Sequence, residues 1–257
     1  MKEATEEVAR LILEAEKVSV FTGAGVSTES GIPDFRSPGG IWSRYDPEDF
    51  TIQRFVADKE ARKRNWEVRK ELVSADYQPN PAHHAIRELE ELGKLSCVIT
   101  QNIDGLHHAA GNTEEKIIEL HGTIKFAKCM DCNDRLLLTD VLERFDKGET
   151  DPHCKKCGGL LKAATVAFGE AMPQDKMRRA ELCSRECDLF IVIGSSLVVY
   201  PAASMPIIAK QAGAKLVIIN FAPTNMDSQA DVVIHEKAGP VMEAIMEKVR
   251  ERIAQAQ

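Results

Sequence analysis

The chain alternates short apolar runs with amphipathic segments along most of its length. The apolar runs predict buried strands at residues 18–21, 95–100, 115–120, 165–168, 189–193, 215–220 and 231–234. Between them, apolar residues at helical spacing predict helices at residues 5–16, 80–92, 173–187, 201–212 and 238–253. Strands that alternate with helices of this length are typical of βαβ units, so the pattern predicts an α/β fold with a doubly wound, parallel, Rossmann-like sheet.

Two segments interrupt this alternation. Residues 37–78 begin with Pro38-Gly39-Gly40 and then mix aromatic side chains with dense charge, which predicts a loop followed by short helices. Residues 125–161 hold two pairs of cysteines. We expect residues 1–36, 79–124 and 162–257 to form the Rossmann-like domain, and the two insertions to form one smaller lobe over its sheet.

The stretch FTGAGVSTESGIPDFR, residues 21–36, follows the first predicted strand and is rich in glycine. Glycines let a backbone approach an anion closely, and the free N–H groups at a helix start point toward it, so the stretch predicts a phosphate-binding loop. The dinucleotide fingerprint G-x-G-x-x-G needs a glycine where Thr28 stands, and no G-K-[ST] follows as in a Walker loop. The spacing therefore favours a nucleotide site but disfavours ordinary hydride transfer.

The composition sets limits on partners and location. With 44% hydrophobic and 28% charged residues in 257, the chain is typical of a globular protein. A net charge of −7 argues against a polyanion as the main partner, and no direct nucleic-acid site is evident. No apolar run approaches the roughly 18 residues of a membrane span, and the acidic, amphipathic start is unlike a signal peptide. We therefore expect a cytoplasmic protein that does not enter a membrane.

The spacing of the cysteines indicates a metal site. Cys129-x-x-Cys132 and Cys154-x-x-Cys157 can supply four thiolates to one tetrahedral Zn²⁺. A closed set of four cysteines leaves no open position, so we predict a structural zinc ion in residues 125–161. His153, beside Cys154, is the alternative ligand. The remaining cysteines are expected to be core or packing residues: Cys97, Cys183 and Cys187.

Polar residues stand at the ends of several predicted strands, where open parallel sheets bind their ligands. Taken singly, Asn102 and Asp104 are equally natural as a helix cap and a turn. Taken in order, however, the chain carries GAGVSTESGIPDFR, TQNID, LHG, two C-x-x-C pairs, VAFGE, GSSLVVYP, Asn220 and KAG between residues 23 and 239. This series resembles the sirtuin (Sir2) family of NAD-dependent protein-lysine deacylases, and the short termini resemble its minimal archaeal and bacterial members.

The resemblance implies NAD as a co-substrate. Sirtuins break the bond between nicotinamide and ribose and trap the ribose carbon with the acyl oxygen of a modified lysine. Ser27, Asn102, Ile103 and Asp104 would form the nicotinamide pocket. The full set of residues that the resemblance assigns to NAD is Gly23, Ala24, Gly25, Ser27, Asp34, Phe35, Arg36, Gln101, Asn102, Ile103, Asp104, Gly194, Ser195, Ser196, Asn220 and Ala238.

The resemblance also assigns catalytic roles to Asn102 and His121. A neutral imidazole with a pKa near its ordinary value of about 6.5 can take a proton from a ribose hydroxyl, so His121 is the expected general base. The implied products are nicotinamide, O-acetyl-ADP-ribose and deacetylated lysine. A protein mono-ADP-ribosyltransferase or an NAD hydrolase at the same site is the nearest alternative, and an inactive NAD-sensing or DNA-associated scaffold is a second. The other histidines are expected to be surface or packing residues: His83, His84, His107, His108, His153 and His235.

The implied substrate is an acetyl-lysine peptide that adds a β-strand between residues 169–170 and 196–199, a mode that recognises little sequence. A chromatin- or DNA-associated protein is one candidate partner. Family members that prefer acidic acyl groups carry a tyrosine followed three residues later by arginine; no tyrosine here has that neighbour, so we expect uncharged acyl groups to be preferred over succinyl. The residues assigned to the substrate are Phe35, His121, Val166, Phe168, Gly169, Glu170 and Val199.

Overall fold

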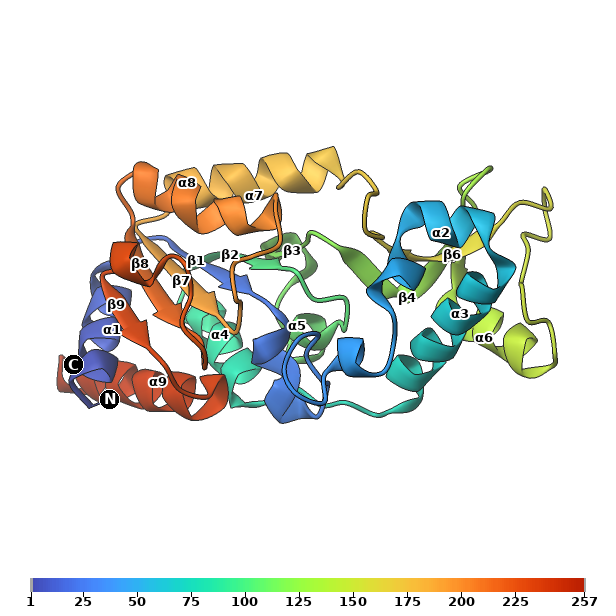
Figure 1. The fold of residues 1–257 in the computed structure, drawn as a ribbon. Coiled ribbons are helices and arrows are strands. Elements are labelled where there is room, and N and C mark those ends of the chain that lie inside the picture. The colour runs from blue at the N-terminus through green and yellow to red at the C-terminus, as the bar shows by residue number, and fades with distance from the viewer. Residues whose placement is uncertain (1, 257) are drawn as a thin grey trace.

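The computed structural model describes residues 2–256 and has a large parallel sheet with a smaller lobe at one end (Figure 1). The sheet is six-stranded, in the order β3-β2-β1-β7-β8-β9, and every neighbouring pair is parallel. Its strands are β1 Val18–Thr22, β2 Leu95–Thr100, β3 Ile117–Glu119, β7 Leu189–Ile193, β8 Lys215–Ile219 and β9 Val232–Ile234. The doubly wound α/β fold predicted from the sequence is confirmed.

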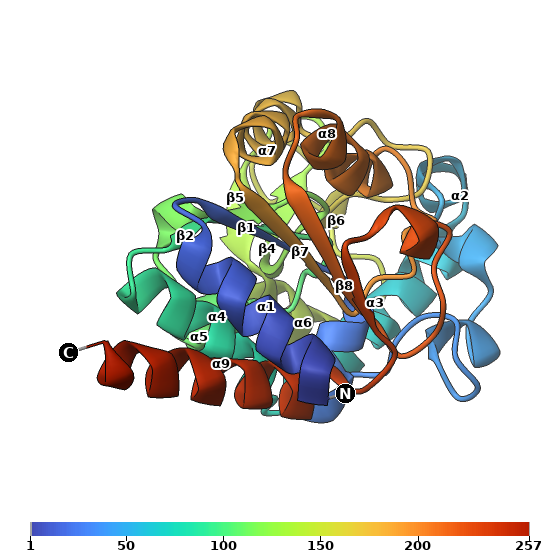
Figure 2. The same cartoon turned by 90° about the vertical axis from the view of Figure 1, so that its left-hand side faces the viewer.

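Helices cover both faces of this sheet (Figures 1 and 2). One face packs against α1 Lys2–Glu14, α4 Pro81–Glu91 and α9 Ala238–Gln255, and the other against α7 Gln174–Glu186 and α8 Met205–Gln211. Val18 and Val20 of β1 join the first core, whereas Phe21 joins the second. A strand buried on both faces is apolar at most of its positions, which explains why these strands appear in the sequence as apolar runs with few polar residues. No described helix is both long and apolar enough to cross a membrane.

The smaller lobe draws on both predicted insertions and on residues beside the second one, since β4 begins at Gly122 and β6 ends at Thr165. Its elements are η2 Ile41–Ser43, η3 Pro47–Phe50, α2 Ile52–Ala57, α3 Lys59–Ser74, β4 Gly122–Cys129, β5 Arg135–Leu137, α6 Leu138–Asp146 and β6 Leu161–Thr165. The three strands form an antiparallel sheet in the order β5-β4-β6. Trp66 of α3 packs in one apolar core with Leu138 and Leu161, and a bidentate ion pair joins Arg62 to Asp151 at 2.8 Å. The exact domain boundaries stay a prediction.

Two predicted elements differ from the structure. We expected residues 165–168 to form a strand of the large sheet, but the strand is β6, Leu161–Thr165, and it pairs with β4 in the small sheet. Phe168 instead makes an isolated bridge to Thr51 of the smaller lobe, in which its N–H donates to Phe50 O at 3.0 Å and its carbonyl accepts from the N–H of Ile52 at 2.9 Å. The glycine-rich stretch continues into a 3-10 helix, η1 Ala24–Ser30, that ends at Gly31 in the left-handed region.

Short turns of helix complete the connections. They are α5 Leu106–Ala109, η4 Glu114–Lys116, η5 Ala202–Ser204 and η6 Asp227–Gln229. The start predicted for α4 is confirmed, because the side chain of Asn80 accepts a hydrogen bond from the N–H of Ala82 at 2.9 Å. The helix predicted at residues 201–212 is divided in two, since η5 ends at Ser204 and α8 begins with Pro206 in its first turn.

Backbone hydrogen bonds tie the carboxyl ends of neighbouring strands together. The N–H of Gly25 donates to Gly194 O at 2.8 Å, and the N–H of Gly194 donates to Ile219 O at 2.9 Å. Gly194 has φ +63°, and a Cβ on it would lie 2.1 Å from the backbone nitrogen of Val26. Only glycine fits this contact, so the loops after β1 and β7 can touch only if this position carries no side chain.

We predict that Gly194→Ala lowers the free energy of unfolding by more than about 2 kcal/mol, because the left-handed conformation alone costs about 1–2 kcal/mol and the clash adds to it. Urea denaturation measures the change. Gly213→Ala is the matched control: φ is +99°, but a Cβ there would meet nothing within 4 Å. Its loss should stay near about 1 kcal/mol. Equal losses for the two variants would contradict the importance of the contact.

Candidate active site

A cleft of about 780 Å³ lies where the carboxyl ends of the large sheet's strands meet the smaller lobe. Every residue that the sequence analysis assigned to NAD or to the peptide lines this one cleft. The set comprises Gly23, Ala24, Gly25, Ser27, Asp34, Phe35, Arg36, Gln101, Asn102, Ile103, Asp104, His121, Val166, Phe168, Gly169, Glu170, Gly194, Ser195, Ser196, Val199, Asn220 and Ala238. The structure thus brings the predicted residues together, whereas their individual roles stay predictions.

The inner part of the cleft holds a compact polar cluster. Ser27 Oγ donates to Asp104 Oδ2 at 2.8 Å, and the side-chain amide of Asn102 donates to Ser27 Oγ at 3.0 Å and to Gly23 O at 3.2 Å. Burial raises the pKa of the Asp104 carboxyl, although hydrogen bonds from Leu106 N–H, Ser27 and Asn102 oppose this. These hydrogen bonds therefore hold the Asn102 amide and the Asp104 carboxylate, which follow β2, against the glycine-rich loop.

His121 stands at the end of β3 with its ring oriented by the backbone. Its Nδ1 lies 2.9 Å from Gln101 O, and because a carbonyl oxygen can only accept, Nδ1 carries the proton. Nε2 is then the atom with the free lone pair. Burial lowers the pKa of His121 below its ordinary value, so the ring stays neutral to lower pH than a free histidine. A neutral, oriented imidazole of this kind can accept a proton.

The loop that follows η1 is held by its own carboxylate. Asp34 Oδ1 accepts hydrogen bonds from the N–H groups of Arg36 at 3.0 Å and Ser37 at 2.8 Å. Phe35 is partly exposed and packs against Trp42, with ring centroids 5.2 Å apart. Asp34 thus shapes the loop from within, and Phe35 presents an aromatic face at the cleft.

The far end of the cleft is formed by loops after β7 and β8 and by the start of α9. Ser195 Oγ accepts a hydrogen bond from Gln101 Nε2 at 2.9 Å, which joins the loops after β2 and β7. The Asn220 amide donates to Ala222 O at 2.6 Å. The N–H of Gly239, next to Ala238, donates to the carboxylate of Glu29 at 2.7 Å, so an acid from η1 caps the N-terminus of α9.

The mouth of the cleft is lined by the segment after β6. The N–H of Val166 donates to His121 O at 2.8 Å, and Phe168 leaves 44% of its surface exposed. Glu170 pairs with Lys162 at 3.0 Å and accepts from the N–H of Ala167 at 2.9 Å. The Glu170 side chain, which the sequence analysis assigned to the peptide, therefore makes its bonds to Lys162 and Ala167 and orders the segment after β6.

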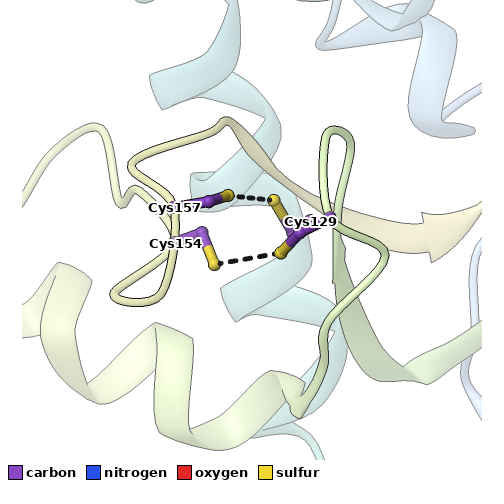
Figure 3. A group of neighbouring side chains, drawn as sticks. Cys129, Cys154 and Cys157 are labelled. Atoms are coloured by element: carbon purple, nitrogen blue, oxygen red, sulfur yellow. Dashed lines mark hydrogen bonds between the residues drawn. The ribbon is translucent and has the colours of Figure 1, made fainter.

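The four paired cysteines converge in the smaller lobe (Figure 3). The sulfur atoms of Cys129, Cys132, Cys154 and Cys157 all lie within 4.8 Å of one another. Cys129 and Cys157 are 3.5 Å apart, and Cys132 and Cys154 are 3.7 Å apart. His153 is not part of this set; its Nδ1 lies 2.8 Å from Gly158 O. The other cysteines lie outside the cluster, with Cys97 and Cys187 buried and Cys183 partly buried.

Comparison with known proteins identifies the family of this chain. The profile of the Sir2 family matches residues 23–201. The chain belongs to the Sir2 family. A relative named NAD-dependent protein deacetylase 1, from Bradyrhizobium diazoefficiens, is 48% identical over 244 residues, covering 94% of this chain and 95% of the relative. The sirtuin resemblance is therefore confirmed.

Solved structures of other sirtuins superpose along nearly the whole chain. A Sir2 enzyme with 44% identity gives a TM-score of 0.89 and covers 98% of this chain and 100% of that one. A Sir2 protein solved with a p53 peptide and NAD⁺ has 38% identity and a TM-score of 0.86, covering 94% of this chain and 97% of that one. The arrangement of sheet and lobe is thus the sirtuin arrangement.

The sequence analysis missed several residues of this sirtuin's cleft that come from the smaller lobe. They include Trp42, Phe50, Trp66, Arg69 and Lys162. Arg69 makes a single 3.3 Å hydrogen bond to Thr165, and burial lowers its pKa to about 10. Trp66 and Arg69 have the spacing of the tyrosine–arginine pattern, so a search that allowed any aromatic residue would have found them. An arginine here opposes the predicted preference for uncharged acyl groups, which stays a prediction.

Proposed function

We infer that this sirtuin is an NAD-dependent protein deacetylase, which moves the acetyl group of a modified lysine to ADP-ribose and releases nicotinamide. The observation that carries this inference is His121: its Nδ1–H is engaged by Gln101 O, so Nε2 is a free base in the same cleft as the glycine-rich loop. The names of the relatives, NAD-dependent protein deacetylase and deacylase, support it.

NAD⁺ supplies the chemistry of bond breaking, since nicotinamide leaves as a neutral molecule from a positively charged ring. The protein's part is to position and to exclude water, because an amide oxygen is a weak nucleophile that competes with solvent. Asn102, Ser27 and Asp104 offer hydrogen-bonding groups fixed on the glycine-rich loop. Phe35 and Trp42 place aromatic surface over the same space. These groups would hold the nicotinamide end of NAD⁺ and exclude water from it.

His121 would then act as the general base. Once the acetyl oxygen has bonded to the ribose carbon and formed an imidate, Nε2 takes a proton from a ribose hydroxyl, whose oxygen attacks the imidate carbon. The C–N bond to lysine then breaks, the lysine nitrogen leaves as an amine with the proton from the ring, and water adds to the acetyl carbon of the cyclic cation that remains. The hydrogen bond from Nδ1–H to Gln101 O stabilises the positive charge that the ring gains when it takes the proton. The products are O-acetyl-ADP-ribose and the free lysine. This assignment gives the partly buried, neutral imidazole a task that fits its protonation state.

We propose that the peptide binds as an added strand between residues 169–170 and 196–199. The backbone N–H groups of Gly169 and Val198 donate to no carbonyl within residues 2–256, so they are available to an extended chain. Main-chain pairing recognises little sequence, which favours a broad range of protein substrates. A chromatin- or DNA-associated partner and a cytoplasmic location stay predictions.

We also propose that the cysteine cluster holds one structural zinc ion. Four sulfurs within 4.8 Å fit a tetrahedral site, and the set is complete without an open position for a substrate. Cys129 ends β4, and Cys154 and Cys157 lie in the loop that leads to β6, so the ion would fasten that loop to the small sheet. Its role would be to hold the lobe that forms one wall of the cleft.

We predict that Cys154→Ser removes the zinc and lowers the free energy of unfolding by more than about 4 kcal/mol, as losses of a metal site do. Elemental analysis of the purified protein and denaturant unfolding measure the two effects. Cys183→Ser, outside the cluster, should keep one zinc per chain. Loss of zinc from neither variant, or a wild-type protein without zinc, would contradict the proposal.

We predict that His121→Ala lowers the rate of deacetylation by about 10²–10⁴-fold, the usual contribution of a general base, while NAD⁺ still binds. Peptide mass analysis gives the rate, and titration calorimetry gives the affinity. His84→Ala, a change at an exposed histidine, is the control and should have no effect. Unchanged deacetylation in His121→Ala would remove the base assignment.

A further inference from the structure

The chain has two pairs of adjacent histidines, His83-His84 on α4 and His107-His108 on α5. In each pair the first ring is buried: His83 is 0% exposed and His107 3%, whereas His84 is exposed and His108 is partly exposed. The two buried rings pack together with centroids 5.0 Å apart. Neither lines the cleft. They therefore form a polar pair in the core that the mechanism above leaves unused.

A chain of short hydrogen bonds leads from His107 to the cleft. His107 Nε2 lies 3.0 Å from Thr22 Oγ1, and Thr22 Oγ1 donates to Thr100 Oγ1 at 2.8 Å. Thr100 Oγ1 in turn accepts from the N–H of Asn102 at 3.0 Å. Thr22 and Thr100 end β1 and β2, so the histidine is linked to both strands and to the residue that follows them.

A second chain leads from His83 to the glycine-rich loop. The N–H of Asn80 donates to His83 Nδ1 at 3.3 Å, and the side-chain amide of Asn80 donates to Val26 O at 2.8 Å and to Ser30 Oγ at 3.0 Å. Val26 and Ser30 lie in η1, the turn whose Ser27 accepts a hydrogen bond from Asn102. The two chains of hydrogen bonds therefore start at the two packed histidine rings and end on the same loop, one directly and one through Asn102.

The hydrogen bonds fix where each ring carries its proton. His83 Nδ1 accepts, so its proton is on Nε2; Thr22 gives its only hydroxyl proton to Thr100, so His107 donates from Nε2 and has a lone pair on Nδ1. Among the described residues, His83 Nε2 and His107 Nδ1 have no partner. One is a donor and the other an acceptor, but they make no hydrogen bond to each other, and the two rings are tilted by 54°. Burial lowers the pKa of His83 to about 4 and that of His107 well below its ordinary value.

We propose that His83 and His107 are positioning residues: as a neutral pair they lock Asn102 and the η1 turn into one arrangement and so shape the nicotinamide end of the NAD site. The proposal rests on the proposed function, because that function places nicotinamide at Asn102. The effect should be local. At the other end of the cleft, Gly194 is held by backbone bonds to Gly25 and Ile219 and the Asn220 side chain by a bond to Ala222 O, and neither residue receives a bond from the pair.

NAD⁺ and ADP-ribose separate this role from a merely structural one, because ADP-ribose lacks nicotinamide. In His107→Asn the shorter amide cannot reach Thr22, whereas in His107→Gln the amide nitrogen can take the place of Nε2. We expect His107→Asn to weaken NAD⁺ binding by about tenfold, the effect of losing one buried hydrogen bond, and to leave ADP-ribose affinity within about twofold of wild type. His107→Gln should restore NAD⁺ binding. Titration calorimetry measures both ligands.

Thr22→Val is the second probe, because it removes both hydroxyl bonds with little change in volume. It should also weaken NAD⁺ binding while leaving ADP-ribose binding unchanged. If His107→Asn does not fold, Thr22→Val alone tests the proposal. His108→Asn is the matched control and should bind both ligands as wild type does. Equal weakening of NAD⁺ and ADP-ribose, or NAD⁺ affinity unchanged in both Thr22→Val and His107→Asn, would overturn the proposal. A wild-type protein that binds NAD⁺ but does not deacetylate would count against the proposed function alone.

Discussion

The structure depends on a backbone contact between two loops at the centre of the sheet. The loop after β1 reaches Gly194 after β7 closely enough for the N–H of Gly25 to donate to its carbonyl at 2.8 Å. β1 lies between β2 and β7 in the sheet, so the residues that follow β2 lie beside the loops that follow β1 and β7. Gln101 then bonds to Ser195, and Asn102 to Gly23 and Ser27. The floor of the cleft is thus a single hydrogen-bonded surface drawn from distant parts of the chain, as expected at the strand ends of a parallel sheet.

The smaller lobe forms the roof of the cleft, opposite this floor. Its aromatic side chains and the segment after β6 enclose the space over His121, and Val166 N–H bonds to the His121 carbonyl. The floor carries the polar cluster of Ser27, Asn102 and Asp104, and the roof formed by the smaller lobe adds aromatic side chains together with Arg69 and Lys162. Enclosure of this kind suits a reaction in which a weak nucleophile must reach a sugar carbon before water does. A zinc ion in the cysteine cluster would stabilise the smaller lobe without contacting the reacting groups.

Much of this could be predicted from the sequence, and the exceptions have physical causes. The strands of the large sheet are mostly apolar because both faces of the sheet are covered by helices, so the hydrophobic pattern predicts each of them. The strand β6 was misplaced because LKAAT is weakly apolar, whereas the run after it looks more strand-like. Trp66 and Arg69 were missed because a helix of another lobe brings them to the cleft. The pairing of His83 with His107 depends on which of two adjacent histidines faces inward, and only packing decides that.

The central claim is that the acetyl oxygen of lysine, rather than water, captures the ribose carbon of NAD⁺ in this cleft. The most direct test incubates the protein with an acetyl-lysine peptide, with and without NAD⁺, and identifies all products by mass. The account predicts equal amounts of nicotinamide, O-acetyl-ADP-ribose and deacetylated peptide, and no reaction without NAD⁺. Deacetylation without NAD⁺, free ADP-ribose with the acetyl group still on the peptide, or ADP-ribose attached to the peptide would contradict it.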